Sequence, residues 1–176
     1  MTKKSLLKTK DNDFIDDWAI VMEAPFGKLG VRTEFTENSL FISEVLYVSQ
    51  LESLIEPKNE LAQQFCEQAE HYFKDPQFQF QLPTLLKGTS FQRKVWSFMD
   101  SIPQGTVVTY GHLAKKIGSA ARAVGGACGA NPYPLIVPCH RVVANSGIGG
   151  FAKEDAEGYH RNIKTWLLKH EGIVLP

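Results

Sequence analysis

The chain has 176 residues, of which 43% are hydrophobic, and its 19 Lys and Arg balance its 19 Asp and Glu at a formal net charge of zero. Such a chain can bury a substantial core in one domain or in two small ones, and no stretch approaches the roughly 18 consecutive apolar residues of a membrane span, so no membrane partner is expected. The polar start, residues 1–11, lacks the apolar region of a secretion signal, so we expect a cytoplasmic protein, or a nuclear one in a eukaryotic cell.

The first part of the chain predicts a small antiparallel sheet. After a polar lead-in over residues 1–17, three short runs rich in β-branched and aromatic residues occupy 18–24, 29–35 and 40–48. The sequences between these runs contain Pro, Gly and Asn, as hairpin turns do. We therefore expect three strands joined by two hairpins.

A helix is predicted from residue 57 to about residue 74, and a connection follows it. Five apolar positions recur at helical spacing and would cover one face of the sheet: Leu61, Phe65, Ala69, Tyr72 and Phe73. Residues 75–83 contain two prolines and three glutamines without a helical period. This stretch is typical of a connection between two domains.

The second half predicts a series of short helices. Thr89 or Ser90 can cap the first, which would end before Gly105, and Thr109 can cap the second, which Gly118 ends. Residues 119–129 follow as a helix of small side chains, and residues 162–170 form a last helix.

The neutral total hides an uneven distribution of charge. Residues 1–84 carry 8 Lys and Arg against 14 Asp and Glu, a balance of −6, whereas residues 85–176 carry 11 against 5, a balance of +6. A basic half can bind a polyanion, although an uneven distribution also arises by chance. Two short helices around a glycine turn in that half favour a helix–turn–helix, a pairing that also occurs in proteins that bind no DNA. Arg122 is the one long side chain of the small-residue helix over residues 119–129. We therefore expect this helix to dock closely on DNA without reading the base sequence.

Cys139 and His140 stand together in an apolar run and form the strongest candidate for chemistry. A thiol with a pKa of roughly 8.5 needs a base or a positive environment to become a nucleophile. In an extended run the two side chains would point to opposite faces, so they meet only if the backbone turns or a water bridges them. Pro138 favours a stiff turn at this point. Taken alone, the pair also fits a buried structural cysteine beside an incidental histidine.

The three cysteines are expected to be free thiols. Cys66, Cys128 and Cys139 cannot all pair, and none has the CxxC spacing of a redox or zinc site. Cys66 lies beside the apolar stripe of its helix and is expected to pack there. Neither a metal nor a cofactor is implied.

Six motifs between residues 88 and 172 closely resemble, in order, the signature of the O6-alkylguanine-DNA alkyltransferases, which are direct-reversal DNA repair proteins. The motifs are Gly88-Thr89-x-Phe91-Gln92-x-x-Val95-Trp96, Ile102-Pro103-x-Gly105-x-x-x-Thr109-Tyr110, Arg122-Ala123-Val124-Gly125, Asn131-Pro132, Pro138-Cys139-His140-Arg141-Val142 and Leu167-Leu168-x-x-Glu171-Gly172. Residues before 88 resemble the family only loosely.

The resemblance implies an α+β fold in two domains. Residues 1–84 would form an N-terminal antiparallel sheet with a helix, of RNase H-like type, together with the linker. Residues 85–176 would form a C-terminal helical domain of winged-helix type that binds DNA and accepts the alkyl group. The implied function is irreversible, single-turnover transfer of a methyl or small alkyl group from O6 of guanine in double-stranded DNA, with O4 of thymine as a second candidate. A monomer is expected.

The resemblance also implies roles for the catalytic group. Cys139 would accept the alkyl group, His140 would reach it through water, and Glu171 would orient the histidine. Asn131 would shape the turn at the active site. Tyr110 would act near the DNA phosphate and the flipped nucleotide, where its hydroxyl is a candidate proton donor.

The remaining implied residues hold the DNA and the extruded base. Arg122 would fill the hole that the flipped nucleotide leaves in the duplex, since extrusion costs a few kcal/mol and the vacated space must be held. Tyr110, Thr89 and Asn145 would contact DNA. A substrate pocket would be lined by Val137, Pro138 and Tyr159.

Several of these residues have plainer alternatives. Glu171 would be an ordinary surface carboxylate, Asn131 only a turn former, and Tyr110 only a packing partner of Phe91. Three cations around the last helix, Arg161, Lys164 and Lys169, are expected to be solvated, with contact to DNA phosphate as the alternative.

The sequence departs from the family pattern after Gly147. Residues 148–160 are several residues longer than the usual loop and carry Glu154, Asp155 and Glu157, which would repel phosphate unless they point away. Either Gly149-Gly150-Phe151 or Gly158-Tyr159 can be aligned with the loop that contacts the flipped base, but not both. The range of substrates is therefore left open.

Two other functions compete with alkyl transfer. An alkyltransferase-like protein would sense damaged DNA without chemistry, but such proteins replace the nucleophile and Cys139 is present here. A Cys-His hydrolase would need an oxyanion site and a second turnover.

Overall fold

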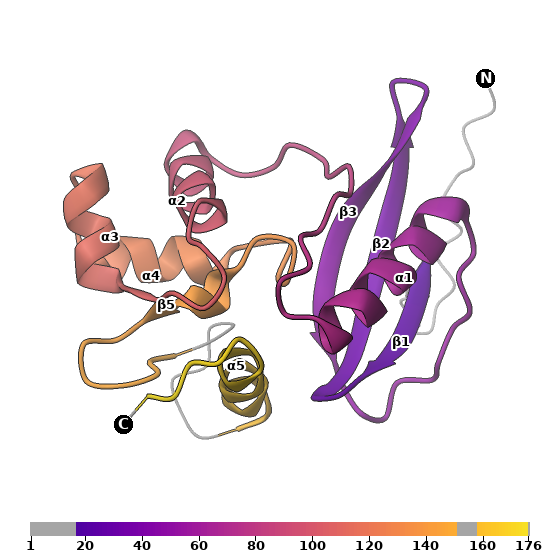
Figure 1. Cartoon of the computed structure of the whole chain (residues 1–176). Coiled ribbons are helices and arrows are strands. Elements are labelled where there is room, and N and C mark those ends of the chain that lie inside the picture. Colours follow the sequence, from indigo (N-terminus) through magenta and orange to yellow (C-terminus); the bar gives the residue numbers. More distant parts are fainter. Residues whose placement is uncertain (1–16, 151–157, 176) are drawn as a thin grey trace, which may run out of the picture.

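In the computed structural model, which describes residues 17–150 and 158–175, a three-stranded antiparallel sheet and one helix form the first half of the chain (Figure 1). The strands β1 (Ile20–Ala24), β2 (Gly27–Thr36) and β3 (Ser39–Val48) lie in the order β1-β2-β3. Glu37 and Asn38 both have positive φ, as the two-residue turns that match strand twist require. The predicted sheet and both hairpins are confirmed.

Helix α1 (Glu60–Lys74) lies on one face of this sheet (Figure 1). It begins three residues later than the sequence suggested because Asn59 is the cap, its side-chain oxygen accepting from the Ala62 N–H. Its buried face carries the predicted apolar positions Leu61, Phe65, Ala69 and Tyr72. The connection that follows contains no helix or strand, as expected.

The second half contains four α-helices and a short parallel strand pair in its described part. Its helices are α2 (Ser90–Asp100), α3 (Tyr110–Ile117), α4 (Ala121–Gly129) and α5 (Tyr159–His170). The strands β4 (Val108–Thr109) and β5 (Val142–Val143) pair in parallel, and the 3₁₀ turn η1 (Cys139–Arg141) directly precedes β5. Strand β4 leads into α3, so the pairing brings η1 close to the start of that helix.

Thr89, and not Ser90, caps α2. Its hydroxyl accepts from the Gln92 N–H, and the Gln92 side chain accepts from the Thr89 N–H in return, which completes a capping box. Thr109 caps α3, and Gly118 ends that helix in a left-handed conformation, both as predicted.

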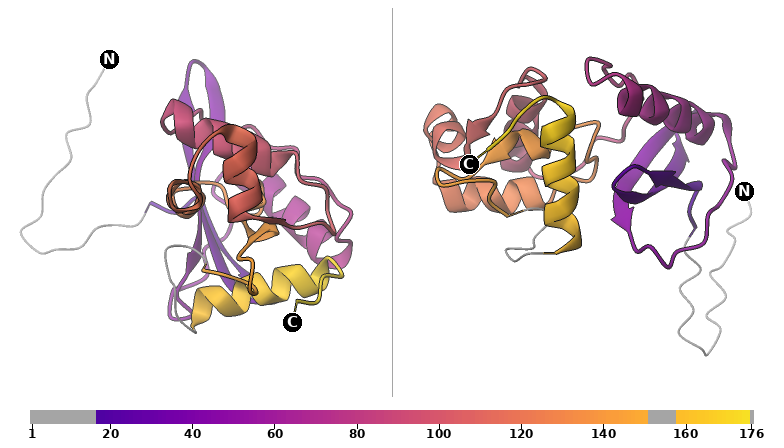
Figure 2. Two further views of the ribbon diagram at one scale, coloured as in Figure 1. Left: turned by 90° about the vertical axis from the view of Figure 1, so that its left-hand side faces the viewer. Right: turned by 60° about the horizontal axis from the view of Figure 1, so that its bottom comes forward.

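Helix α5 lies between the helices of the second half and the sheet of the first half (Figure 2). At its start, the Tyr159 hydroxyl donates to the Val48 carbonyl at 2.9 Å and accepts from the Lys28 N–H at 3.1 Å. At its end, His170 Nε2 lies 2.6 Å from the Tyr72 carbonyl oxygen. One buried apolar cluster runs through both halves, so α5 ties them together at each of its ends.

No helix within residues 17–150 and 158–175 has the length and apolar character needed to cross a bilayer.

Candidate functional site

Cys139 stands at a sharp turn between Pro138 and β5. Pro138 has φ −80° and ψ 69°, and the Cys139 N–H donates to the Val137 carbonyl two residues back at 2.8 Å, which is an inverse γ-turn. The stiff turn expected at this proline is therefore present. The apolar run is not extended through Cys139, which is 8% exposed.

Asn131 braces this turn from the end of α4. Its side-chain amide donates to the Val137 carbonyl at 2.9 Å, while its side-chain oxygen accepts from the Tyr133 N–H at 3.0 Å. These contacts fit both a turn former and an active-site residue. A hydrogen bond from the same amide also acts on the Cys139 sulfur.

His140, the next residue of the same turn, pairs with Glu171. His140 Nε2 is 2.8 Å from Glu171 Oε1, and both side chains are almost fully buried. The alternative that Glu171 is an ordinary surface carboxylate is therefore wrong. The other ring nitrogen, Nδ1 of His140, is buried without a hydrogen-bond partner among the described residues. One nitrogen is thus held while the other is left to accept a proton.

Burial and hydrogen bonds set the charges of this pair. Burial lowers the pKa of His140, against the opposing effect of Glu171. Burial alone would raise the pKa of Glu171, but the hydrogen bonds from His140 and Arg141 hold it well below its usual range. The resting state is therefore a neutral imidazole beside an ionised carboxylate.

Arg141 completes the carboxylate site, and sequence reasoning assigned it no role. Its Nε lies 3.0 Å from Glu171 Oε2 and its Nη2 lies 2.9 Å from Oε1, a bidentate pair. A third nitrogen, Nη1, donates to the Ile102 carbonyl at 2.7 Å. The available signal was the position of Arg141 directly after His140 within the matched motif.

Lys164 is fully buried, so the expectation that it is solvated was wrong. It lies on the buried face of α5 together with Ile163, Leu167 and Leu168. Its Nζ donates to the Val142 carbonyl at 2.7 Å and to the Gly150 carbonyl at 2.9 Å, which compensates the loss of water. Burial lowers the pKa of Lys164 to about 8, and its interactions with Cys139 and Cys128 oppose that change.

Tyr110 lies between this lysine and the loop after β5. Its hydroxyl donates to the Gly150 carbonyl at 3.2 Å and lies 3.4 Å from Lys164 Nζ. The structure therefore places Tyr110 among polar partners, beyond simple packing against Phe91. Lys169 is exposed, as expected, whereas Arg161 is half-buried.

The pKa of the Cys139 thiol reflects its surroundings. Burial raises this pKa, while the hydrogen bond from Asn131 and the positive charge of Lys164 lower it. The thiol is consequently protonated at rest, and a base is needed to generate the nucleophile. All three cysteines are free, and within the described residues no three His, Cys, Asp or Glu side chains gather as metal ligands would.

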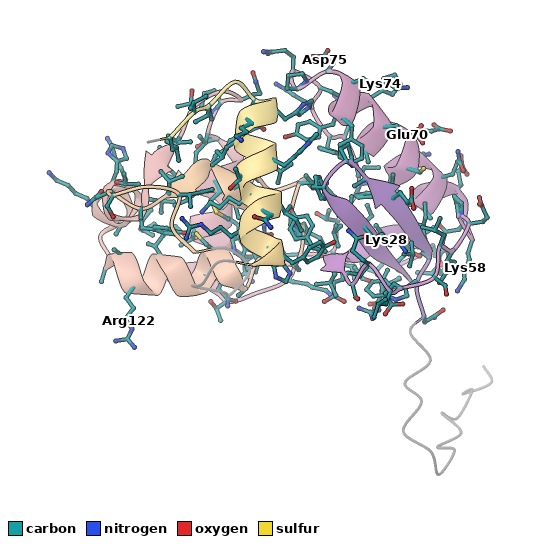
Figure 3. All side chains as sticks on the ribbon, turned by 90° about the horizontal axis from the view of Figure 1, so that it is seen from below. Lys28, Lys58, Glu70, Lys74, Asp75 and Arg122 are labelled. Carbon is teal, nitrogen blue, oxygen red and sulfur yellow. The ribbon has the colours of Figure 1, made fainter. Side chains whose placement is uncertain are left out.

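Of the residues expected to contact DNA, Tyr110 is half-buried, whereas Arg122, Thr89 and Asn145 are exposed and lie on different elements. Arg122 projects from α4 into solvent (Figure 3). Thr89 lies at the start of α2, where its hydroxyl is engaged in capping, and Asn145 lies in the loop after β5.

The residues expected to line a substrate pocket do not come together. Val137 lines a hollow of about 590 Å³ with Tyr133, and Pro138 lines a separate one of about 440 Å³ on the side of the connection. Tyr159 is bonded to the sheet of the first half through Lys28 and Val48. These contacts give no support to a place for Tyr159 in a pocket beside Cys139.

A further hollow of about 470 Å³ lies along the loop after β5 and the outer face of α5. Cys139 is not among its lining residues. The acidic residues of the long loop, Glu154, Asp155 and Glu157, lie outside the described residues, as does Phe151.

The chain is similar to proteins of one repair family. Residues 90–173 match the profile described as 6-O-methylguanine DNA methyltransferase, DNA binding domain. The methylated-DNA–protein-cysteine methyltransferase of Shigella flexneri is 50% identical over 97 residues, which cover 53% of each chain. The constitutive enzyme of the same name from Bacillus subtilis is 36% identical over 158 residues, which cover 86% of this chain and 93% of the relative. The chain thus spans about half the length of the first of these relatives and nearly all of the second.

Solved structures agree with these matches. The crystal structure of Mycobacterium tuberculosis O6-methylguanine methyltransferase superposes with a TM-score of 0.68 at 30% identity, covering 86% of this chain and 90% of that one. The crystal structure of Mycobacterium tuberculosis OGT in complex with DNA gives a TM-score of 0.68 at 31% identity with the same coverage.

Proposed function

Because the chain belongs to the family of methylated-DNA–protein-cysteine methyltransferases, we propose that it repairs DNA by direct reversal, moving a methyl or small alkyl group from O6 of guanine to Sγ of Cys139. The observation that carries the proposal is the buried His140–Glu171 pair, whose histidine follows Cys139 in the 3₁₀ turn η1. Such a pair supplies a base of fixed orientation to a nucleophile that is protonated at rest.

The proposed reaction begins with a proton transfer. The thiol proton of Cys139 passes through a bridging water to Nδ1 of His140, the ring nitrogen that has no partner among the described residues. The ionised Glu171 stabilises the resulting imidazolium through its contact with Nε2. Lys164 and the Asn131 amide stabilise the thiolate, because both lower the pKa of Cys139.

The thiolate then attacks the alkyl carbon in line with the departing oxygen. The S–C bond forms, the C–O6 bond breaks, and the electron pair stays on the guanine, which takes a proton from a donor such as the Tyr110 hydroxyl. A thioether is a poor leaving group, so Cys139 stays alkylated and the protein acts once. Chemistry on O6 inside the stack requires the nucleotide to be extruded.

The substrate in this proposal is double-stranded DNA with an alkylated guanine, and O4-alkylthymine is a second candidate. Helices α3 and α4 would form the helix–turn–helix of a winged-helix-type domain over residues 85–176, and residues 1–84 would form an RNase H-like domain. Arg122, exposed on small-residue α4, would fill the space left by the base, while Tyr110, Thr89 and Asn145 would contact the strand. The protein would act as a monomer in the cytoplasm, or in the nucleus of a eukaryotic cell.

The test uses the protein with an equimolar duplex that carries one O6-methylguanine, and an unmodified duplex as the control. Intact-mass and peptide mass spectrometry should show one added methyl group on the peptide with Cys139, and none in Cys139→Ser. Repeated turnover at catalytic protein concentration, or a methyl group on Cys66 or Cys128, would defeat the assignment. Tight binding of the modified duplex without any mass change would instead support a damage sensor.

A further inference from the structure

Tyr72 brings a residue of the first half of the chain into the carboxylate site. It lies in the last turn of α1, is 2% exposed, and its hydroxyl donates to Glu171 Oε1 at 2.8 Å across 99 residues of sequence. Its ring packs edge-on against His170, which also contacts the Tyr72 carbonyl. The sequence predicted this tyrosine only as an apolar contact of the helix.

The hydrogen-bonding capacity of the Glu171 carboxylate is filled. Oε1 accepts from His140 Nε2, Arg141 Nη2 and the Tyr72 hydroxyl, at 2.8, 2.9 and 2.8 Å. Oε2 accepts from Arg141 Nε at 3.0 Å and from the Gly105 N–H at 3.4 Å. A carboxylate offers about four lone-pair sites. The three donors on Oε1 therefore share its electron density, and each weakens it as an acceptor for the others.

We propose that Tyr72 is a positioning residue for His140, acting through Glu171: its hydroxyl fixes the carboxylate and limits the basicity of Oε1. The carboxylate fixed in this place holds the imidazole proton on Nε2 and leaves Nδ1 to accept the proton of Cys139. The inference rests on the proposed alkyl transfer for its role in repair. The link between Tyr72 and His140 can nevertheless be measured without that reaction.

The charged surroundings of the pair are consistent with this role. The groups that act on His140 are Glu171, Arg141 and Lys164, and those that act on Tyr72 are Glu171 and Arg141. Tyr47 on β3 and His170 on α5 also lie near Tyr72. Burial and the neighbouring carboxylate raise the pKa of Tyr72, so the hydroxyl remains a neutral donor throughout the range in which His140 titrates.

A residue of the connection between the two halves also contacts Glu171 indirectly, through Gln104. Gln77 donates to the side-chain oxygen of Gln104 at 2.6 Å, and Gln104 donates to the Glu171 carbonyl at 3.3 Å. The Gln104 bond holds the backbone of Glu171, whereas the Tyr72 hydroxyl is the contact that reaches its carboxylate from residues 17–84. Removing that one oxygen should therefore change the carboxylate without releasing the backbone.

The test is Tyr72→Phe, which keeps the ring and removes the hydroxyl. Its matched control is Tyr133→Phe, because Tyr133 is also buried and donates through its hydroxyl, but to the Leu85 carbonyl. Proton and nitrogen NMR of the His140 ring follow its Nε2 proton and its titration in the free protein. In Tyr72→Phe the Nε2 proton should move downfield and the titration midpoint should rise by about half a pH unit, since Oε1 becomes the stronger acceptor.

Alkyl transfer supplies the second measurement. The rate constant at neutral pH should fall about tenfold in Tyr72→Phe, because the carboxylate loses one of its anchors, and the acid limb of the pH profile should follow the His140 midpoint. In Glu171→Gln, the further change Tyr72→Phe should leave the His140 resonances unmoved. An unshifted midpoint in Tyr72→Phe, or an equal shift in Tyr133→Phe, overturns the inference. Failure of the wild-type protein to take up alkyl groups would instead overturn the proposed function.

Discussion

Nε2 of His140 lies 2.8 Å from Oε1 of Glu171, while Nδ1 of the same ring has no hydrogen-bond partner in the part of the chain that the structure describes. The carboxylate fixes one tautomer, in which Nε2 carries the proton and Nδ1 is the acceptor. The ring nitrogen that can take a proton is thereby selected before any substrate arrives.

Glu171→Gln should remove a pH-dependent part of the stability. The pKa of Glu171 is held below its unfolded value of about 4.3, so its contribution is present above that pH and is lost as the pH falls toward the native pKa. At neutral pH the variant should lose about 3 kcal/mol of unfolding free energy, because a buried ion pair loses one partner. Urea unfolding between pH 3 and pH 7 measures the difference, which should shrink toward pH 3.

Glu70→Gln is the control, because Glu70 is an exposed carboxylate on α1 (Figure 3). A pH-independent difference between wild type and Glu171→Gln would contradict the assignment of a charged, hydrogen-bonded Glu171.

Lys164→Met should show the cost of a buried ammonium group. The pKa of Lys164 falls to about 8 from an unfolded value of about 10.4, so the unfolded chain binds more protons between these values. The lysine's contribution to stability therefore rises with pH across this window, by at most about 1.4 kcal/mol per pH unit. Urea unfolding of wild type and of Lys164→Met at pH 7, 8.5 and 10 measures this contribution. Both proteins contain the same tyrosines and cysteines, so the titration of those groups cancels in the difference between the two unfolding free energies.

The same substitution should slow the reaction of Cys139 with iodoacetamide, because the thiolate loses a nearby positive charge. The matched variant Lys169→Met removes an exposed lysine from the same helix and should change neither measurement. Equal behaviour of the two variants would argue against an electrostatic role for Lys164.

Arg122→Ala should separate DNA engagement from chemistry. Because Arg122 projects into solvent, the unfolding free energy should change by less than about 0.5 kcal/mol (Figure 3). Methyl transfer from duplex DNA should slow about tenfold or more, since nothing then holds the vacated space, while transfer from the free base O6-methylguanine should be unchanged. Lys74→Ala removes a positive charge from α1 as the control. Slowing with both substrates would place Arg122 in the chemical step instead.

Thr89→Ala should cost about 1 kcal/mol of stability, because the capping box of α2 loses its hydroxyl. Ser90→Ala is the matched control, since Ser90 is equally exposed and is not the cap. Thermal or urea unfolding measures the loss. Binding of unmodified duplex DNA by both variants then tests the proposed strand contact separately, and equal stability of the two variants would rule out the cap.

Local signals in the sequence predicted most of the elements and the sulfur-bearing turn. Thr109, Gly118 and Pro138 each act on neighbouring backbone, so their effects could be anticipated without knowledge of the fold. The start of α1 was less predictable, because Asn59 competes with Pro57 as the start signal. The resemblance to the family pointed to Glu171 as the partner of His140, and the structure contains that contact.

Long-range contacts were not predictable from the same signals. Lys164 was assigned to solvent because nothing local marks a lysine whose charge is compensated by the Val142 and Gly150 carbonyls. Tyr159 was assigned to a pocket, yet its partners are on strands more than a hundred residues earlier. Tyr72 was recognised as a buried ring, but its hydroxyl partner depends on how the two halves dock.

The hairpin between β1 and β2 constrains the site from a distance. A Cβ placed on Gly27, which has φ +148°, would lie 2.1 Å from the hydroxyl oxygen of Tyr159. A side chain at this position would have to displace the Tyr159 ring, whose hydroxyl contacts with Lys28 and Val48 hold the first turn of α5 on the sheet. A substitution in this hairpin could thus loosen the docking of α5 without touching any residue proposed to contact DNA.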